Sequence, residues 1–537
     1  MTRSQPPSDK LARTLGLSPK PLGLKMVRGV VFSLTRKMVA GPLFLLLVPF
    51  TLHKVGATGY GTWAILMTLI NISLFLDWGL GESVIKHIAE YNGKKDIELT
   101  QRLLNATFAL YLLIATLTVC LLGFGSHFIV GQLFHGPSDQ IISQVLTLWP
   151  LLLLIVAADV LARPFSSAIN GLQRIDLANV VLFVQSLINA GFTIAFLLAG
   201  AKLGGLLLAT LLSSLFNLIA CAAITRKLLP AIVPNPLRCD LPMLKQICTF
   251  SLALFSGRAM VMIQGQLEKL YLARFVGVVQ VGWYEVASES ASKVRRLPDQ
   301  LLSPVMAAAS ELHAADEQDK LRELYFRINK YFAVSAIPFV VFALFSAKAL
   351  MKLWLGPGLV AIAVPFAGLV IGNLFLQVGA PIHAVLVGRG ILRPGVYGAL
   401  VTGALNIVLS YIFIRRWGFA GAMLGTTLSM VLGSIYFFAA AAPHFEIPLY
   451  QTLFRAYLKP VLCSFAAALA MWPVRSMGPS GWRDLLGGVG VFGIVYLAGL
   501  LLTRFFDSFD LTKAERYLPI FRFARRMMPL PVRATSE

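Results

Sequence analysis

The chain of 537 residues has few charged residues, and this scarcity excludes most soluble proteins. Asp, Glu, Lys and Arg make up only 13% of it, against roughly 25% in soluble domains. Apolar residues make up 57%. The composition therefore excludes a soluble enzyme and indicates a polytopic membrane protein.

Acidic residues are the scarcer of the charged types, with 25 Asp and Glu against 47 Lys and Arg, a formal net charge of +22. A nucleic-acid-binding protein presents such an excess on a soluble surface, which this composition does not provide. We therefore expect no nucleic-acid partner. The excess instead indicates membrane orientation and an anionic ligand or lipid.

Motifs for catalysis and for metal binding are also missing. The 5 cysteines have no CxxC or Cys/His spacing, so we expect no disulfide framework and no metal site. The sequence contains no P-loop, zinc motif or nucleophile elbow. We expect a protein that is not an enzyme and has no cofactor. Without an ATPase, transport must be coupled to an H+ or Na+ gradient or to the concentration of the substrate.

Long apolar runs, by contrast, are abundant. About 20 apolar residues suffice to cross a membrane as a helix, and we count fourteen such runs. The predicted fold class is an all-α polytopic membrane protein with 14 transmembrane helices. The runs cover residues 27–51, 59–80, 104–124, 144–163, 177–199, 203–223, 247–273, 280–307, 330–352, 359–386, 393–414, 418–440, 455–473 and 484–504.

The distribution of Lys and Arg between the loops predicts the orientation. They concentrate in the even-numbered loops and the tails, while the longest odd loop, Gly125 to Gln144, has none. By the positive-inside rule, we expect both termini of this multi-pass protein to be cytoplasmic. The basic tail, with its aromatic residues, is expected either to lie on the anionic leaflet or to be simply solvated.

A weak internal repeat relates two groups of six runs. Val55-Gly56, Gly61 and Trp63 match Val276-Gly277, Gly282 and Trp283, and four later residues match residues 217 positions further on. The repeat predicts two six-helix bundles related by a pseudo-two-fold axis, plus two C-terminal helices. The predicted segments are residues 1–26, a cytoplasmic N-terminal tail; 27–226, the N-terminal bundle; 227–246, a cytoplasmic linker; 247–440, the C-terminal bundle; 453–504, helices 13 and 14; and 505–537, a basic cytoplasmic tail.

Cations inside the first run of each bundle are the first candidates for a binding site. Arg36 and Lys37 lie about ten residues into the first run, and Arg258 lies at the position that the repeat assigns to Lys37. A charge at bilayer depth costs about 2.5–3.5 kcal/mol on insertion scales. Arg36 and Lys37 either reach the interface from a helix that starts after them or face a wet cavity.

The eighth run carries the strongest polar pattern in the chain. Intervals of three and four residues place its polar side chains on one helical face. The stripe serves either as an internally neutralised face, with Glu289 paired to Lys293, or as a ligand site. We predict Lys293, Arg296 and Gln300 as substrate-binding, together with the cations above. The stripe consists of Glu285, Glu289, Lys293, Arg296 and Gln300.

Acidic residues in the runs are candidates for gating or ion coupling. Glu285 and Glu289 are predicted to exchange partners with an anionic substrate. Asp77 closes the second run, where it caps a helix, forms an ion pair or carries a proton. We expect Asp159 to pair with Arg163 one turn later.

Four short stretches resemble the Wzx-type polysaccharide flippases of the multidrug/oligosaccharidyl-lipid/polysaccharide (MOP) superfamily. They are Gly56-Ala57-Thr58-Gly59-Tyr60-Gly61-Thr62-Trp63, Asp77-Trp78-Gly79-Leu80-Gly81, Ala89-Glu90-Tyr91 and Asn170-Gly171-Leu172-Gln173-Arg174. The resemblance extends over runs 1 to 12, and fourteen runs are similar to the lipid II flippase branch. That branch's N-terminal pattern is not evident here, so the resemblance does not imply lipid II as the substrate.

The resemblance implies a flippase with a central cationic cavity. The implied substrate is an undecaprenyl-pyrophosphate-linked glycan, which is moved from the inner to the outer leaflet for cell-surface polysaccharide assembly by alternating access. The implied partners are the lipid bilayer, a polysaccharide polymerase and a chain-length regulator. The alternatives are an ion-coupled drug or cation antiporter of the same superfamily, whose cavity would be dominated by acids, and a membrane polysaccharide polymerase, which would need a larger external loop.

Overall fold

The structure is a computed structural model that describes most of the chain. It describes residues 22–75, 77, 79–134, 139–230, 232, 234–299, 302–445, 449–472 and 481–507. The side chains at 22–40, 74–75, 250, 252–264, 297, 303 and 449 are outside this description. The predicted tails therefore lie largely outside the described residues.

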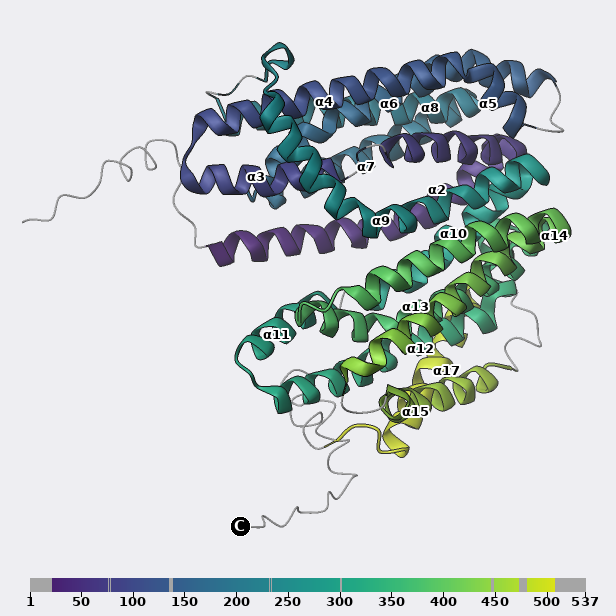
Figure 1. Ribbon diagram of the computed structural model, residues 1–537. Helices are drawn as coiled ribbons and strands as arrows, with labels where there is room; N and C mark the ends of the chain where they lie inside the picture. Colours follow the sequence, from purple (N-terminus) through teal and green to yellow (C-terminus); the bar gives the residue numbers. More distant parts are fainter. Residues whose placement is uncertain are drawn as a thin grey trace, which may run out of the picture. The chain divides into compact units, whose positions relative to one another are not determined.

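The described residues form helices and short connections, without any strand, which confirms the all-α fold class (Figure 1). The α-helices are α2 Leu22–Phe75, α3 Leu80–Lys94, α4 Ile97–Phe124, α5 Ser126–Leu133, α6 Asp139–Gly171, α7 Ile175–Leu198, α8 Lys202–Leu228, α9 Leu241–Phe275, α10 Val278–Asp299, α11 Ser303–Ala314, α12 Gln318–Leu355, α13 Ala363–Gly388, α14 Arg393–Ala441, α15 Leu449–Ala470 and α17 Trp482–Leu502. The 3-10 helices are η1 Pro236–Arg238, η3 Pro357–Ile362 and η4 Ala442–His444.

The long helices coincide with the predicted apolar runs. Each run overlaps a helical segment, and α2 and α14 each cover two runs. In the part of the chain that the structure describes, 10 helices are long and apolar enough to cross a membrane. The protein is therefore a multi-pass membrane protein, and the count of fourteen spans stays a prediction.

Two helices occur where the sequence indicated only connectors. Helix α3 follows the break after α2, and α5 lies in the predicted third external loop. Helix α3 buries one face, which includes Val84, His87, Ile88 and Tyr91, while its opposite face is polar. An amphipathic helix of this kind is too polar and too short to register as a membrane span.

The chain divides into two compact units, Met1–Gly282 and Trp283–Glu537. In the first unit α6 packs on α3, α4 and α8, and α9 packs on α2, α3 and α4. In the second unit α13 packs on α11, α12 and α14. Figure 1 shows α4, α6 and α8 side by side in the first unit. The bundle limits predicted from the repeat remain a prediction.

Matching helix crossings occur inside both units. A Cβ atom on Gly171, at the end of α6, would lie 2.8 Å from Cβ of Ile88 on α3. A Cβ atom on Gly388, at the end of α13, would lie 2.6 Å from Cβ of Ala309 on α11. Ala309 follows Ile88 by 221 residues and Gly388 follows Gly171 by 217, so the same crossing is built twice. In this respect α11 is the counterpart of α3.

A hydrogen-bonded Asn–Ser pair is also repeated. Nδ2 of Asn189 donates to Oγ of Ser213 over 3.2 Å, and Nδ2 of Asn406 donates to Oγ of Ser429 over 3.3 Å. Both serines in turn donate to the carbonyl oxygen three residues earlier, at 2.8 Å. The repeat therefore extends from single residue matches to the polar contacts between helices, where such contacts add to van der Waals packing.

Glycines with positive φ mark the corresponding breaks. Gly56 has φ +79° within α2, and Gly277 has φ +141° between α9 and α10. Glycine adopts such values without the steric cost that other residues meet. Shortly after these breaks, Gly61 and Gly282 meet at a close crossing in the first unit, where a Cβ on Gly282 would lie 3.0 Å from Cα of Gly61.

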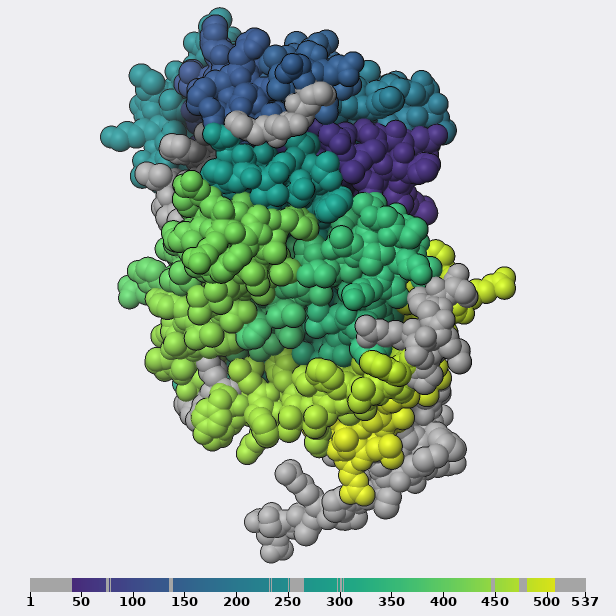
Figure 2. Space-filling view, turned by 90° about the vertical axis from the view of Figure 1, so that its right-hand side faces the viewer, coloured from purple at the N-terminus to yellow at the C-terminus, as the bar shows by residue number. Residues whose placement is uncertain are grey.

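The two helices beyond the repeat pack on the second unit. Helix α15 lies on α12 and on α17, and the hydroxyl of Tyr496 on α17 donates to the carbonyl oxygen of Val334 on α12 over 2.9 Å. Figure 2 shows these yellow-green and yellow helices against the green helices of the same unit. Nζ of Lys330 lies 3.5 Å from Asp507 Oδ2, so the segment after α17 is also held to α12.

We expect Gly171→Ala and Gly388→Ala each to destabilise the protein by about 1–3 kcal/mol, because the added methyl group overlaps a neighbouring helix. The measurement is the midpoint of thermal unfolding of the purified protein in detergent. Gly191→Ala is the matched control, since its Cβ would meet nothing within 4 Å. An equal effect at all three positions would contradict the close crossings.

Candidate functional site

The polar stripe of the eighth run lies on α10 and is partly accessible. Nζ of Lys293 lies 3.5 Å from Oε2 of Glu289 one turn earlier, and the two side chains are 38% and 37% exposed. Arg296 is exposed, and Glu285 is partly buried. Gln300 lies outside the described residues. The ion pair expected in the neutralised alternative is therefore formed, although Lys293 and Arg296 remain accessible.

Sequence reasoning missed a second ion pair on α10. Nη1 of Arg295 lies 4.0 Å from Oδ2 of Asp299, and Nε2 of Gln377 on α13 donates to the carbonyl oxygen of Arg295 over 3.1 Å. The i,i+4 spacing of Arg295 and Asp299 was the available signal. From the sequence alone, however, Arg295 could not be assigned a role different from that of the neighbouring Arg296.

For the cations Arg36, Lys37 and Arg258, the structure describes the backbone only. Helix α2 begins at Leu22, so Arg36 and Lys37 lie within it, and Arg258 lies within α9. Their side chains are outside the described part, and whether they approach one another stays a prediction. The alternative in which the first helix starts after Lys37 does not match the observed start of α2.

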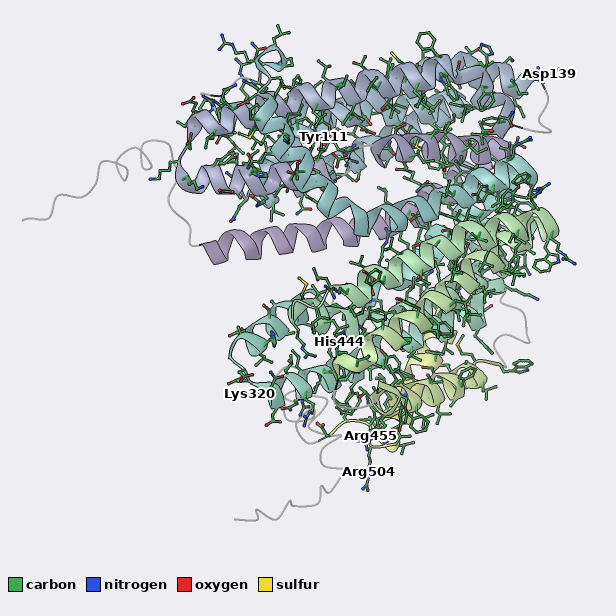
Figure 3. All side chains as sticks on the ribbon, in the orientation of Figure 1. Tyr111, Asp139, Lys320, His444, Arg455 and Arg504 are labelled. Atoms are coloured by element: carbon green, nitrogen blue, oxygen red, sulfur yellow. The ribbon has the colours of Figure 1, made fainter. Side chains whose placement is uncertain are left out.

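Asp77 joins three helices of the first unit. It lies in the break between α2 and α3, where its side chain is 16% exposed. Its Oδ1 accepts a hydrogen bond from the hydroxyl of Tyr111 on α4, the residue that is labelled in the first unit in Figure 3. Its Oδ2 lies 3.2 Å from Nη1 of Arg163 on α6. The side chain is thus ion-paired and hydrogen-bonded at once.

Arg163 pairs with Asp77, not solely with Asp159 as the i,i+4 spacing suggested. The carboxylate of Asp159 is hydrogen-bonded to Ser214 on α8. The four-residue spacing of Asp159 and Arg163 indicated a pair within one helix, whereas the break after α2 brings a carboxylate to Arg163 from 86 residues away in sequence. This partner is visible only in the folded chain.

Asp299 has a position in the second unit that corresponds to that of Asp77. It is the last residue of α10, just before α11, as Asp77 follows α2 just before α3. Asp299 pairs with Arg295 of its own helix, whereas Asp77 pairs with an arginine from α6. The carboxylate is therefore common to the two helix breaks, while its partner differs.

Chemically, these groups can hold an anion and can exchange ion pairs. A guanidinium group binds phosphate oxygens through two parallel hydrogen bonds, and an ammonium group binds them as a point charge. In the described part of the chain, His, Cys, Asp and Glu form no cluster of three or more that could hold a metal ion. The accessible cations of α10 are the groups best suited to an anionic ligand.

The sequence matches the family described as polysaccharide biosynthesis protein over residues 26–310. No curated protein matches it in sequence. Among solved structures, it is similar to a lipid II flippase, MurJ, in an inward closed conformation, with a TM-score of 0.71 and 14% identity, over 89% of this chain and 98% of that one.

Two transporters of the MOP superfamily have a similar fold. The first is a multidrug resistance MATE family transporter in an inward-facing conformation, with a TM-score of 0.59 and 16% identity over 77% of this chain and 97% of that one. The second is a transporter from Pyrococcus furiosus, with a TM-score of 0.55 and 16% identity over 78% of this chain and 95% of that one. At these identities, the similarity establishes the fold, which confirms the expected MOP architecture.

Asp77→Asn and Arg163→Met are each expected to lower stability by about 1–3 kcal/mol, because each leaves a largely buried partner without its counter-charge. The double variant should lose less than the sum of the single losses. Thermal unfolding of the four purified proteins measures this coupling. Strictly additive losses would show that the ion pair contributes nothing to holding α6 at the helix break.

Proposed function

Because this chain belongs to the polysaccharide biosynthesis protein family, we propose that it is a flippase for a lipid-linked glycan. Its substrate in this proposal is an oligosaccharide on undecaprenyl pyrophosphate, moved from the inner to the outer leaflet of the bacterial cytoplasmic membrane. The observation that carries the proposal is the cationic end of α10, where Lys293 and Arg296 remain accessible on a helix that lies in a predicted span.

The physical problem that such a protein solves is the transfer of polar groups through hydrocarbon. A hydroxyl group stripped of water without a replacement hydrogen bond costs several kcal/mol, at roughly 2–7 kcal/mol per group. A glycan carries many hydroxyl groups, and its pyrophosphate carries charge as well. A polar cavity that opens to one side at a time removes this cost while the polyprenyl chain stays in the lipid.

In the proposed mechanism, the cations bind the pyrophosphate and the acids of α10 release them. Nζ of Lys293 lies 3.5 Å from Oε2 of Glu289. The pyrophosphate replaces Glu289 as the partner of Lys293 and engages the guanidinium group of Arg296. Arg36, Lys37, Arg258 and Gln300 remain predicted substrate-binding residues, and Glu285 is the second acid that exchanges partners in this proposal.

In this proposal Asp77 has a role in gating and does not carry the coupling proton. It contacts Tyr111 and Arg163 at a helix break. A change in the angle between α2 and α3 must therefore either break the Asp77–Arg163 ion pair or move Arg163 together with Asp77. Coupling to an H+ or Na+ gradient is part of the proposal. A cation antiporter would need a cavity dominated by acids, whereas Lys and Arg outnumber Asp and Glu in this chain by 47 to 25.

Arg258→Gln is expected to abolish export, with at least a tenfold loss, because a neutral amide cannot replace a guanidinium group as a partner of phosphate. Surface polysaccharide is the readout, and the protein level in the membrane is measured alongside. Arg274→Gln, on the same helix near its C-terminal end, is the matched control and should retain export. Export that survives in Arg258→Gln would remove this residue from the site.

Deletion of the gene should cause the undecaprenyl-linked glycan to accumulate on the inner leaflet. Accessibility of the glycan to a membrane-impermeant lectin, before and after permeabilisation, distinguishes the leaflets. Loss of a polymerase would instead leave single repeat units on the outer leaflet. Loss of a drug exporter would leave the lipid-linked glycan unchanged, and either of these results would reject the flippase.

A further inference from the structure

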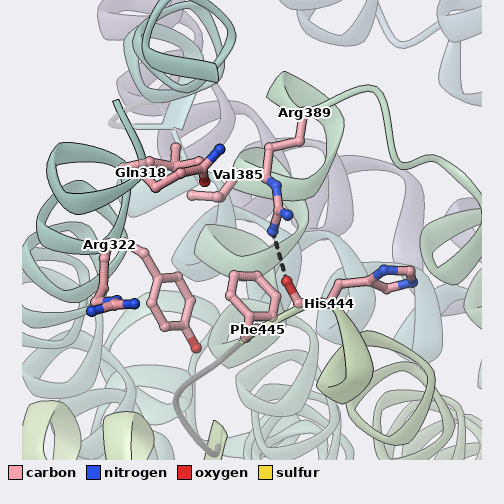
Figure 4. Close-up of a pocket in the computed structure, with 8 residues that line it drawn as sticks. Gln318, Arg322, Val385, Arg389, His444 and Phe445 are labelled. Carbon is pink, nitrogen blue, oxygen red and sulfur yellow. Dashed lines mark hydrogen bonds between the residues drawn. The ribbon is translucent and has the colours of Figure 1, made fainter. Parts of the chain in front are cut away.

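A small basic pocket lies at one end of the second unit, and no proposed transport residue is among the described residues that line it. The start of α12, the end of α13 and the η4 segment form it (Figure 4). The positive-inside pattern assigns these three helix ends to the cytoplasmic side. Its lining residues are Gln318, Leu321, Arg322, Tyr325, Val385, Arg389, His444 and Phe445.

Arg389 is held rigidly at this pocket. Its Nη1 donates to the carbonyl oxygen of His444 over 2.7 Å, and its guanidinium carbon lies 5.9 Å from the ring centroid of Phe445. Phe445 in turn stacks on Tyr325 with the ring centroids 4.4 Å apart. Nε of Arg389 is buried and has no hydrogen-bond partner among the described residues. The contacts of Arg389 with His444 and Phe445 thus hold its guanidinium group at the lining of the pocket.

The charge of the pocket is positive. Among the residues that the structure describes, its lining contains two arginines and no carboxylate. Arg322 lies 3.9 Å from Asp319, whose side chain is 99% exposed, and such a surface pair contributes little. The free space is about 60 Å³, against roughly 10–15 Å³ for one water molecule, so a group of the size of phosphate fits.

The first unit provides an internal comparison, because the same helix ends recur there. Helices α4 and α12 begin 221 residues apart, so Gln101 corresponds to Arg322, and Leu172 corresponds to Arg389 next to the repeated glycine. In the first unit two contacts join the connection after α8 to α4: Asn235 N donates to Oδ1 of Asn105 over 2.8 Å, and Nη1 of Arg102 lies 3.9 Å from Oδ2 of Asp240. The first unit thus also has an arginine at the start of α4, but a leucine in place of Arg389.

We propose that this pocket binds a phosphate group, separately from the transported substrate. Two guanidinium groups and the amide of Gln318 supply donors for tetrahedral oxygens, and the guanidinium fork favours phosphate over a halide. The phosphate belongs either to the headgroup of an anionic lipid of the inner leaflet or to a small soluble molecule. The pocket chemistry is the same for both sources.

The test uses the full-length protein in a neutral detergent and two probes. Inorganic phosphate, at an ionic strength matched with chloride, represents the soluble source, and dihexanoyl phosphatidylglycerol represents the lipid headgroup. Binding is measured by the rise in the unfolding temperature as each probe is titrated, since a ligand that binds only the folded state stabilises it. Response to the lipid alone assigns the lipid source, and response to phosphate alone assigns the soluble one.

Arg389→Gln should weaken binding of the responding probe about tenfold or more, because a charge-assisted hydrogen bond is lost. Arg322→Gln should weaken it as well, and this exposed position leaves the Arg389–His444 contact in place if Arg389→Gln fails to fold. Lys320→Gln, which removes a charge from the same helix end outside the lining, should bind within about twofold of the wild type.

Three results would overturn the proposal. The first is a wild type that responds to neither probe, and the second is an equal response of wild type, Arg322→Gln and Arg389→Gln. The third is binding that appears only in Glu446→Gln, which would mean that the chain's own carboxylate fills the pocket; Glu446 lies outside the described residues. None of these results bears on glycan export, so the flippase proposal is tested separately.

Discussion

A charged group on a membrane helix needs a partner or water, and this requirement organises the polar residues of this protein. The backbone groups satisfy one another within the helices, so the side chains carry the remaining polar interactions. Asp77 meets Arg163 and Tyr111, and Glu289 meets Lys293. Where such partners come from different helices, they also fix the helices relative to one another. Where both partners lie on the same helix, as Glu289 and Lys293 do on α10, the ion pair does not tie that helix to another one.

The repeat shows which contacts the architecture itself requires. Close crossings at Gly171 and Gly388, and the pairs Asn189–Ser213 and Asn406–Ser429, occur in both units with the same geometry. They are neutral and depend on small residues or on hydrogen bonds between uncharged side chains. The partners of the charged residues do not follow the repeat in the same way. Both helix breaks carry a carboxylate, but Asp77 pairs with Arg163 of another helix and Asp299 with Arg295 of its own, and Arg389 corresponds to Leu172. Packing is thus shared by the halves, and the ion-pair partners distinguish them.

The candidate site follows from this division. The cations that we propose as partners of phosphate and that the structure describes lie on α10 and at the start of α12 and the end of α13, which line the pocket. Family membership gives a polysaccharide-related role, and the excess of cations is the reason for proposing an anionic ligand. A protein built from two similar packing units and dissimilar charges can hold a charged substrate without altering the contacts that keep each unit folded.

The sequence by itself determined the class, the helices and the repeat, because runs of about 20 apolar residues and recurrent glycines are local properties. It also determined the stripe on α10, since intervals of three and four residues place side chains on one helical face. It did not indicate that α3 is a helix, because its mixed polar and apolar residues are also typical of a connector between spans. It also did not indicate the partner of Arg163, which comes from a distant helix break. The pocket around Arg389 likewise depends on three helix ends that only folding brings together. Periodicity is encoded along the chain, whereas the choice among ion-pair partners is made by distance in space, and that distance is set by the packed helices.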